Sequence, residues 1–212
     1  PKDRPVIGVT GDLYTRINRV GNRGVFHHLE SMGCEVWPCP YFVASVDITA
    51  WRDSRRDARR LHVKDAFWET LSWGITTGVF KRLFRNVDPE ALALATEQKP
   101  SRLVELAGPF VSEHTNWLVL LGVGKIADFI ECGVQGVINA VAVHCMVGVV
   151  IDSALPLLRN TYTETPIITL TYGGTEGPAQ HVRLETFVHT VLERSRRSGR
   201  APEGASQQRT PS

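Results

Sequence analysis

The segment Gly136-Val-Ile-Asn-Ala-Val-Ala-Val-His-Cys-Met-Val-Gly148 decides how this chain folds. Its first eight residues are almost all apolar, which predicts a buried strand of a parallel sheet. The strand ends at His144, Cys145 and Met146, and helical spacing predicts a helix over Val149 to Leu158. The sequence therefore predicts a cysteine at a strand-to-helix turn, which is where open α/β sheets bind their ligands.

Two more strands are predicted before this segment and one after it. They span Arg4–Asp12, Cys34–Cys39 and Ile167–Tyr172, and each is bounded by glycine or proline. Between the first two strands, apolar residues at helical spacing predict a helix with Asn22 as its cap and Gly33 as its stop. A strand, a helix and a strand within ~35 residues form one crossover unit of a parallel sheet.

The segment 50–112 interrupts this alternation of strands and helices. It has many charges, helical patterns and no strand-like run, so we expect a helical insertion between the second and third strands. Further helices are predicted over Trp117–Ile130 and from about Gln180 to Arg194. The residues that we expect these two helices to bury are Leu118, Leu121, Ile126 and Ile130 in the first, and Val182, Phe187, Val188 and Val191 in the second.

The expected fold class is α/β, with a four-stranded, mostly parallel open sheet and helices on both faces. We expect one domain over residues 1–194, followed by a disordered basic tail over 195–212, because that tail has almost no apolar residues.

Composition argues against two classes of partner. Lys and Arg number 24 against 22 for Asp and Glu, and the net charge of +2 gives no reason to expect binding to nucleic acid or to an anionic membrane. No apolar run approaches the ~20 residues of a membrane-spanning helix, and no signal sequence is recognisable at the amino end. We therefore expect a cytoplasmic protein.

The four cysteines are not expected to form one metal site. Cys34 and Cys132 fall at the amino edge of the sheet, whereas Cys39 and Cys145 fall at the carboxyl edge. A five-residue strand at ~3.3 Å per residue separates the edges by ~16 Å, too far for ligands ~2.3 Å from one metal. Cys34, Cys39 and Cys132 are expected to be small buried apolar residues. Cys145 differs, because the start of the following helix favours a thiolate.

Further polar residues and glycines are predicted at the carboxyl edge. They are Thr10, Gly11, Asp12 and Tyr14 after the first strand, and Tyr172, Gly173 and Gly174 after the fourth. Glycines there allow a ligand to approach the backbone. The chain has no dinucleotide-binding glycine fingerprint and no phosphate-binding loop, which argues against an autonomous nucleotide hydrolase. It also has no Gly-x-Ser-x-Gly, the motif that carries the nucleophilic serine of many Ser-His-Asp enzymes.

Other charged residues have simpler interpretations. Arg183 and Glu185, in the first turns of the last helix, are typical of a solvated pair. His27, His28 and His189 have no partner at the sequence spacing of a metal site, so we expect them on helix surfaces.

The chain resembles the domain related to the D component of 2-hydroxyacyl-CoA dehydratases, which also occurs in proteins associated with the ATP-driven activator of these enzymes. The resemblance spans roughly residues 4–192. Its three motifs, in order, are Arg4–Asp12 with Tyr14, Asn18 and Leu29–Trp37; Gly136–Asn139 with Cys145, Met146 and Gly148; and Tyr172–Glu176 with Arg183–Phe187. The sequence departs from the family pattern at Ala142, Val143, His144, Val147 and Gly173.

The resemblance implies an iron–sulfur cluster bound at the sheet edge, with Cys145 as a ligand and Cys39 as a weaker candidate. The other ligands would come from a partner or from a missing segment. The further binding residues expected there are Thr10, Gly11, Asp12, Tyr14, His144, Met146, Tyr172, Gly173 and Arg183.

The function implied by this resemblance is that of an accessory or partial domain in a dehydratase and activator system. Its partner would be a dehydratase or activator subunit, its substrate an acyl-CoA, and its chemistry low-potential electron transfer. One alternative is a non-catalytic interaction module that docks through residues 52–64. Another is a metal-free domain that binds a small molecule through Thr10–Tyr14 and Tyr172–Thr175. Whether the chain is itself an enzyme stays open.

Overall fold

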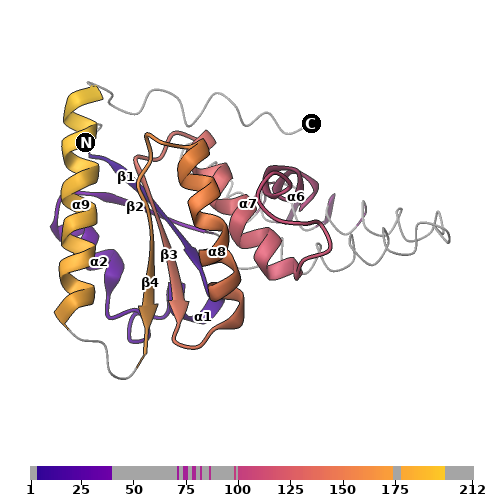
Figure 1. Cartoon of the computed structure of the whole chain (residues 1–212), viewed down its shortest axis with the longest axis horizontal. Coiled ribbons are helices and arrows are strands. Elements are labelled where there is room, and N and C mark those ends of the chain that lie inside the picture. Colours follow the sequence, from indigo (N-terminus) through magenta and orange to yellow (C-terminus); the bar gives the residue numbers. More distant parts are fainter. Residues whose placement is uncertain are drawn as a thin grey trace.

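The computed structural model of the chain describes residues 4–39, 100–173 and 178–198, together with single residues between 71 and 98. In chain order, its elements are β1 (Val6–Gly11), α1 (Leu13–Ile17), α2 (Val25–Ser31), β2 (Glu35–Pro38), α6 (Pro100–Ala107), α7 (Trp117–Glu131), β3 (Gly136–Ala142), α8 (Met146–Thr161), β4 (Ile167–Tyr172) and α9 (Pro178–Ser198) (Figure 1). All four predicted strands are present, with ends within two residues of the predicted ones.

The sheet confirms the predicted α/β class, and all four of its strands run parallel in the order β2-β1-β3-β4. In register, Thr10 of β1 lies opposite Asn139 of β3, which lies opposite Thr169 of β4. The connection after β1 passes over one face of the sheet through α2, and the connection after β3 passes over the other face through α8 (Figure 1). The carboxyl ends of β1 and β3 therefore form the switch point at which doubly wound sheets open a crevice.

Helices cover both faces of the sheet, as predicted (Figure 1). On one face, α2 and α9 bury Val25, Leu29, Phe187 and Val188 against Ile7, Val9 and Ile138. On the other face, α7 and α8 bury Val123, Phe129, Ile151 and Leu155 against Val137 and Ile167. Val137 and its neighbour Ile138 pack into the cores on opposite faces of the sheet. β3 must therefore be apolar on both faces, and this continuous apolar run is the pattern that predicted the strand.

Most residues that the structure describes in the predicted insertion between the second and third strands are helical. Residues 71, 74, 75, 78, 79 and 82 are helical, and α6 follows them. Most of the segment 50–112, including the docking face expected at 52–64, lies outside the described residues. Within the described part of the chain, no helix combines the length and the apolar character that crossing a membrane requires.

Predicted helix ends differ from the observed ones in α2, α8 and α9. The cap of α2 is Gly24, in the left-handed conformation with φ of 68°, rather than Asn22. Asn22 is buried just before this helix. Its Oδ1 atom accepts from the Gly24 N–H at 3.0 Å, and its Nδ2 atom donates to the Arg16 carbonyl at 3.1 Å. The helix after β3 begins at Met146, three residues earlier than predicted, and α9 continues to Ser198, so residues 195–198 are helical.

Two residues predicted to be buried are exposed. Leu118 is 40% exposed, whereas its neighbours Val119 and Leu120 on α7 are buried. The predicted burial of Ile126 in the same helix is confirmed. Val182 is 57% exposed because it lies outside the arc through which α9 faces the sheet. The buried residues of that arc are Leu184, Phe187, Val188 and Val191, at the spacing of one helix face.

A close contact between β1 and α7 provides a test of this packing. A Cβ atom on Gly8 would lie 2.5 Å from Cδ2 of Phe129, whose ring also packs on Trp37 with centroids 5.2 Å apart. We expect Gly8→Ala to lower the free energy of unfolding by about 1–3 kcal/mol, because the core is overpacked there. In a Phe129→Leu background the same substitution should cost less, and urea unfolding of the four proteins measures the difference. An equal cost in both backgrounds would contradict this account.

Candidate functional site

A pocket of about 370 Å³ lies at the carboxyl edge of the sheet, next to the ends of β1 and β3. The residues that line it are Thr10, Gly11, Asp12, Leu13, Arg16, Cys39, Trp117, Leu118, Leu121, Gly122, Lys125, Val141, Cys145, Val147, Gly148 and Ile151. Five of the site residues predicted from the sequence are among them, namely Thr10, Gly11, Asp12, Cys39 and Cys145. The pocket thus occupies the switch point of the sheet, and its other walls come from α1, α7 and α8.

The end of β1 approaches β3 so closely that only glycine fits. Gly11 has a φ of 116°, and a Cβ atom there would lie 2.0 Å from the Ala140 carbonyl oxygen. The next residue, Asp12, donates its N–H to the same carbonyl at 2.8 Å. The Asp12 carboxylate accepts from the Thr15 N–H at 2.8 Å and so caps α1. The geometry of this turn therefore occupies one oxygen of the Asp12 carboxylate before any ligand binds.

Cys145 lies at the predicted strand-to-helix turn. It is the N-cap residue of α8, its side chain makes no capping hydrogen bond, and it is half-buried against the pocket. Its backbone N–H donates to the Ala142 carbonyl at 3.1 Å, across the turn in which His144 adopts a left-handed φ of 60°. The side chain of Cys145 is thus held at the positive end of the α8 dipole.

Cys39 reaches the same pocket from the end of β2. It is 6% exposed, and its N–H donates to the Val9 carbonyl at 2.7 Å. All four cysteines of the chain are thiols. Within the described residues, neither Cys39 nor Cys145 belongs to a group of three side chains close enough to hold a metal ion. The structure therefore brings two thiols to one pocket but provides no third ligand among the residues that it describes.

Two cationic side chains beside the pocket were missed in the sequence. Lys125 is 2% exposed, and its Nζ lies 2.8 Å from Asp128 Oδ2 and 4.8 Å from the centre of the Phe129 ring. Arg16 is 5% exposed and lines the pocket from α1. The sequence feature that could have predicted the buried Lys125 is its spacing of i, i+3 from Asp128 inside an otherwise apolar helix. Burial of such a pair is unfavourable unless the two charges meet.

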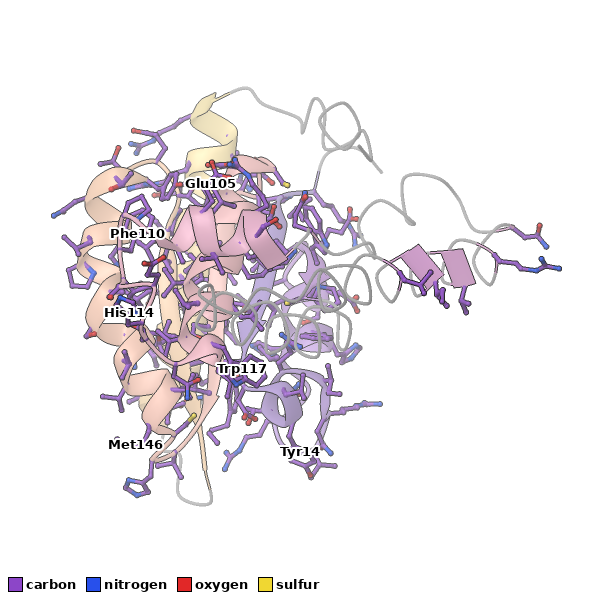
Figure 2. The ribbon with its side chains drawn as sticks, turned by 90° about the vertical axis from the view of Figure 1, so that its right-hand side faces the viewer. Tyr14, Glu105, Phe110, His114, Trp117 and Met146 are labelled. Carbon is purple, nitrogen blue, oxygen red and sulfur yellow. The ribbon has the colours of Figure 1, made fainter. Side chains whose placement is uncertain are left out.

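Several predicted binding residues lie away from the pocket. Tyr14 and Met146 are 65% and 78% exposed and point outward at this edge of the molecule, on either side of Trp117 (Figure 2). His144 is exposed as well. Gly173 is half-buried and packs against the side chain of Val143.

Tyr172 and Arg183 belong to the opposite face of the sheet. Tyr172 is buried in the core between the sheet and α9. Arg183 donates to the Thr169 carbonyl at 3.2 Å rather than pairing with Glu185, so it attaches α9 to β4. The structure therefore does not bring these two residues to the pocket.

Cys34 and Cys132 lie at the opposite end of the sheet from Cys145, as strand polarity predicted. Cys34 is fully buried next to the start of β2, and burial raises the pKa of its thiol to about 11, while the charge of Arg4 acts in the opposite direction. This thiol stays protonated near neutral pH, which fits the expected role as a small apolar residue.

Comparison of the chain with protein-family models, with curated proteins and with solved structures finds no match. The function must therefore be argued from the pocket itself.

The buried ion pair beside the pocket gives a prediction about stability. Lys125→Met leaves Asp128 as a buried charge without its partner, so we expect the free energy of unfolding to fall by about 3–5 kcal/mol. The double substitution Lys125→Met, Asp128→Leu should recover much of that loss, because it removes both charges.

Urea unfolding measures all three proteins. Arg102→Gln is the matched control, since it breaks ion pairs of 2.9 and 3.1 Å with Glu131 and Glu105 that are largely exposed. This control should cost no more than about 1 kcal/mol. A double variant as unstable as Lys125→Met alone would show that the pair is not the cause.

Proposed function

We propose that this chain is a ligand-binding α/β domain, whose pocket at the carboxyl edge of the sheet binds a small, mostly apolar molecule with an acidic group. A short-chain carboxylic acid has this chemistry. The observation that carries the proposal is the position of the pocket, at the switch point between β1 and β3. Open α/β sheets bind their ligands at this point.

The lining of the pocket favours an apolar ligand. Aliphatic side chains from three helices dominate it: Leu13, Leu118, Leu121, Val147 and Ile151. The volume of about 370 Å³ falls within the range of about 300–1,000 Å³ that is typical of small-molecule sites. Burial of an alkyl chain contributes about 0.8 kcal/mol per CH₂ group, so a short acyl chain gains most of its affinity from this lining.

The charges around the pocket favour an acidic group on that ligand. The charge of Lys125 is balanced by Asp128, and one oxygen of the Asp12 carboxylate accepts from the Thr15 N–H at the start of α1. Arg16 adds a guanidinium, and Val147 and Gly148 in the first turn of α8 also line the pocket. The N–H groups and the positive dipole end of a helix both favour an anion.

A second candidate function is favoured by one observation, namely that Cys39 and Cys145 line the same pocket. We propose, as this alternative, an accessory domain of a 2-hydroxyacyl-CoA dehydratase and activator system. The two thiols would then supply part of the ligand set of an iron–sulfur cluster, which provides low-potential electron transfer when it is bound. Such clusters take up to four thiolates, so a partner or another segment would complete the set.

The first proposal is tested with hexanoate and 1-hexanol, which share an alkyl chain and differ in charge. We expect hexanoate to raise the melting temperature of the chain and to bind more tightly than 1-hexanol, because only the acid interacts with Arg16 and with the start of α8. Leu121→Trp fills the pocket and should abolish both effects.

Leu157→Trp is the matched control for the pocket, since Leu157 is 51% exposed on α8 and does not line the pocket. This variant should bind hexanoate as the unchanged chain does. No stabilisation by either compound, or equal stabilisation of the Leu121→Trp variant, would refute the proposal.

The second candidate is tested by iron and acid-labile sulfide analysis of protein purified without oxygen. We expect about four irons per chain or per pair of chains, with visible absorption, and loss of both in Cys145→Ala. Cys132→Ala should keep the iron, because Cys132 lies at the other end of the sheet. Absence of iron after anaerobic reconstitution together with the dehydratase or activator partner would overturn this candidate.

A further inference from the structure

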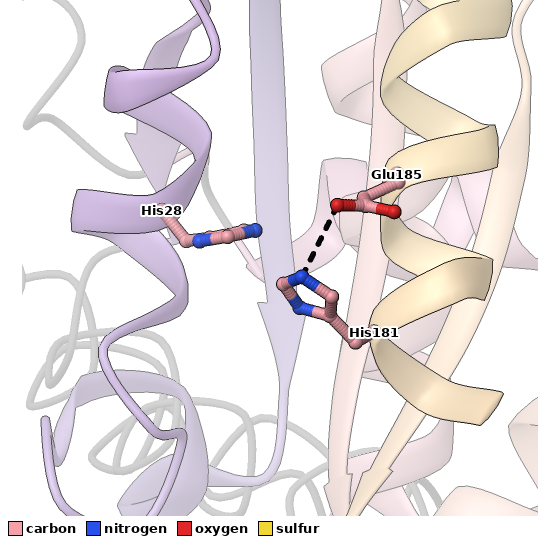
Figure 3. A group of neighbouring side chains, drawn as sticks. All are labelled: His28, His181 and Glu185. Carbon is pink, nitrogen blue, oxygen red and sulfur yellow. Dashed lines mark ion pairs between the residues drawn. The ribbon is translucent and has the colours of Figure 1, made fainter. Parts of the chain in front are cut away.

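Three polar side chains meet at the seam between α2 and α9, on the face of the sheet opposite α7 and α8. The ring of His28 lies 4.7 Å from that of His181, centroid to centroid, and His181 Nε2 lies 3.1 Å from Glu185 Oε1 (Figure 3). One ring nitrogen of each histidine and one carboxylate oxygen lie within 4.8 Å of one another. His28 was expected on a helix surface, and it is a half-buried residue of α2. Its neighbours His181 and Glu185 come from the far end of the chain, so sequence spacing did not predict them.

His28 has an unusual environment for a histidine. Its Nε2 atom is buried and makes no hydrogen bond to any residue that the structure describes. A buried polar atom without a partner is destabilising, and most such atoms in folded proteins are satisfied by protein, water or an ion. An imidazole nitrogen that faces a second histidine and a carboxylate has the surroundings of a metal ligand.

We propose that His28, His181 and Glu185 bind a zinc ion that links α2 to α9. Two histidines and one carboxylate, with water in the fourth position, form a recurring ligand set for zinc. Ligand atoms about 2.0–2.2 Å from a tetrahedral zinc are about 3.3 Å apart, and the His181–Glu185 pair already has nearly this spacing. Side-chain rotation of His28 provides the remaining approach.

The backbone provides the frame for this site. His181 and Glu185 are separated by four residues on α9, so they project from the same face of that helix. α2 and α9 are already fixed relative to each other, because Leu29 of α2 and Val188 of α9 belong to one buried core. The side chains of His181 and Glu185 are 58% and 51% exposed, which leaves a path for the ion to enter.

This zinc site is independent of the pocket at the sheet edge, because the two share no residue. A zinc ion bound between α2 and α9 stabilises the folded chain, because the unfolded chain does not hold the three ligands together. Binding of zinc should therefore raise the melting temperature whether or not the pocket is filled.

The test is a zinc titration of the full chain by calorimetry, in competition with a chelator of known affinity. We expect one zinc per chain and a higher melting temperature with zinc. His28→Ala, His181→Ala and Glu185→Gln should each weaken binding by at least about tenfold, because even the loss of an outer-shell partner of a zinc ligand costs about 10–100-fold. Circular dichroism establishes that each variant is folded, and His181→Ala, at an exposed position, is the least disruptive of the three.

A second pair on the same helix provides a matched control. His189 and Glu193 have the same i, i+4 spacing and lie 3.9 Å apart, but within the described residues no third ligand approaches them. His189→Ala should leave the affinity for zinc unchanged. Three results would overturn the proposal: no zinc bound by the unchanged chain, equal weakening by His189→Ala and His28→Ala, or an affinity that depends on Cys145→Ala instead.

Discussion

The burial of α7 is the constraint on which the rest of this structure depends. This helix packs against the sheet, α6 and α8 at once, and the contact on each side requires a residue without a side chain. Gly8 makes room for Phe129, a Cβ on Gly122 would lie 2.4 Å from the side chain of Ile151 on α8, and one on Gly124 would lie 2.1 Å from the Leu103 carbonyl of α6. With so little free surface on α7, a charge such as that of Lys125 has to be balanced within the helix itself. Asp128, one turn along, provides this balance.

The same packing creates the pocket. Leu118 and Leu121, near the amino end of α7, line the pocket together with residues of α1 and of the start of α8. Much of the wall is therefore aliphatic, whereas the polar groups are few and come from the strand ends, from Arg16 of α1 and from Lys125 of α7. This separation of apolar walls from a few polar groups is typical of sites for small organic ligands. It is also the reason why we propose a ligand that carries an alkyl chain.

Much of the fold could be predicted, because the strands have strong local signals. The apolar run from Gly136 to Val143 can only be a strand buried on both faces, and strand polarity alone placed Cys39 and Cys145 at one edge. Helix faces were harder to predict. A periodic pattern locates one buried arc, but α7 is buried almost all round, so its pattern did not identify Leu118 as the residue that turns outward.

The polar sites were predicted less completely than the fold, for a different physical reason. Strand polarity assigned Thr10, Asp12 and the two cysteines to one edge of the sheet, because each lies at or just after the carboxyl end of a strand. Arg16 and Lys125 reach the pocket from helices, and their direction depends on how those helices pack. His28 and His181 come together only through the docking of α2 and α9 on the same face, which no local spacing records. Tyr172 was placed at the sheet edge for the same reason, because it ends a strand. Its side chain is instead buried in the core.

The order of the strands also determines when the chain can fold during its synthesis. β1 pairs with β2 on one side and β3 on the other, yet about 100 residues separate the end of β2 from the end of β3. A ribosome takes roughly 5–20 s to add that many residues. Throughout that interval the amino-terminal strands form at most a two-stranded sheet, which is marginal in water. During that interval the edge of β1 that later pairs with β3 has unpaired backbone groups, and such an edge is prone to pair with other chains.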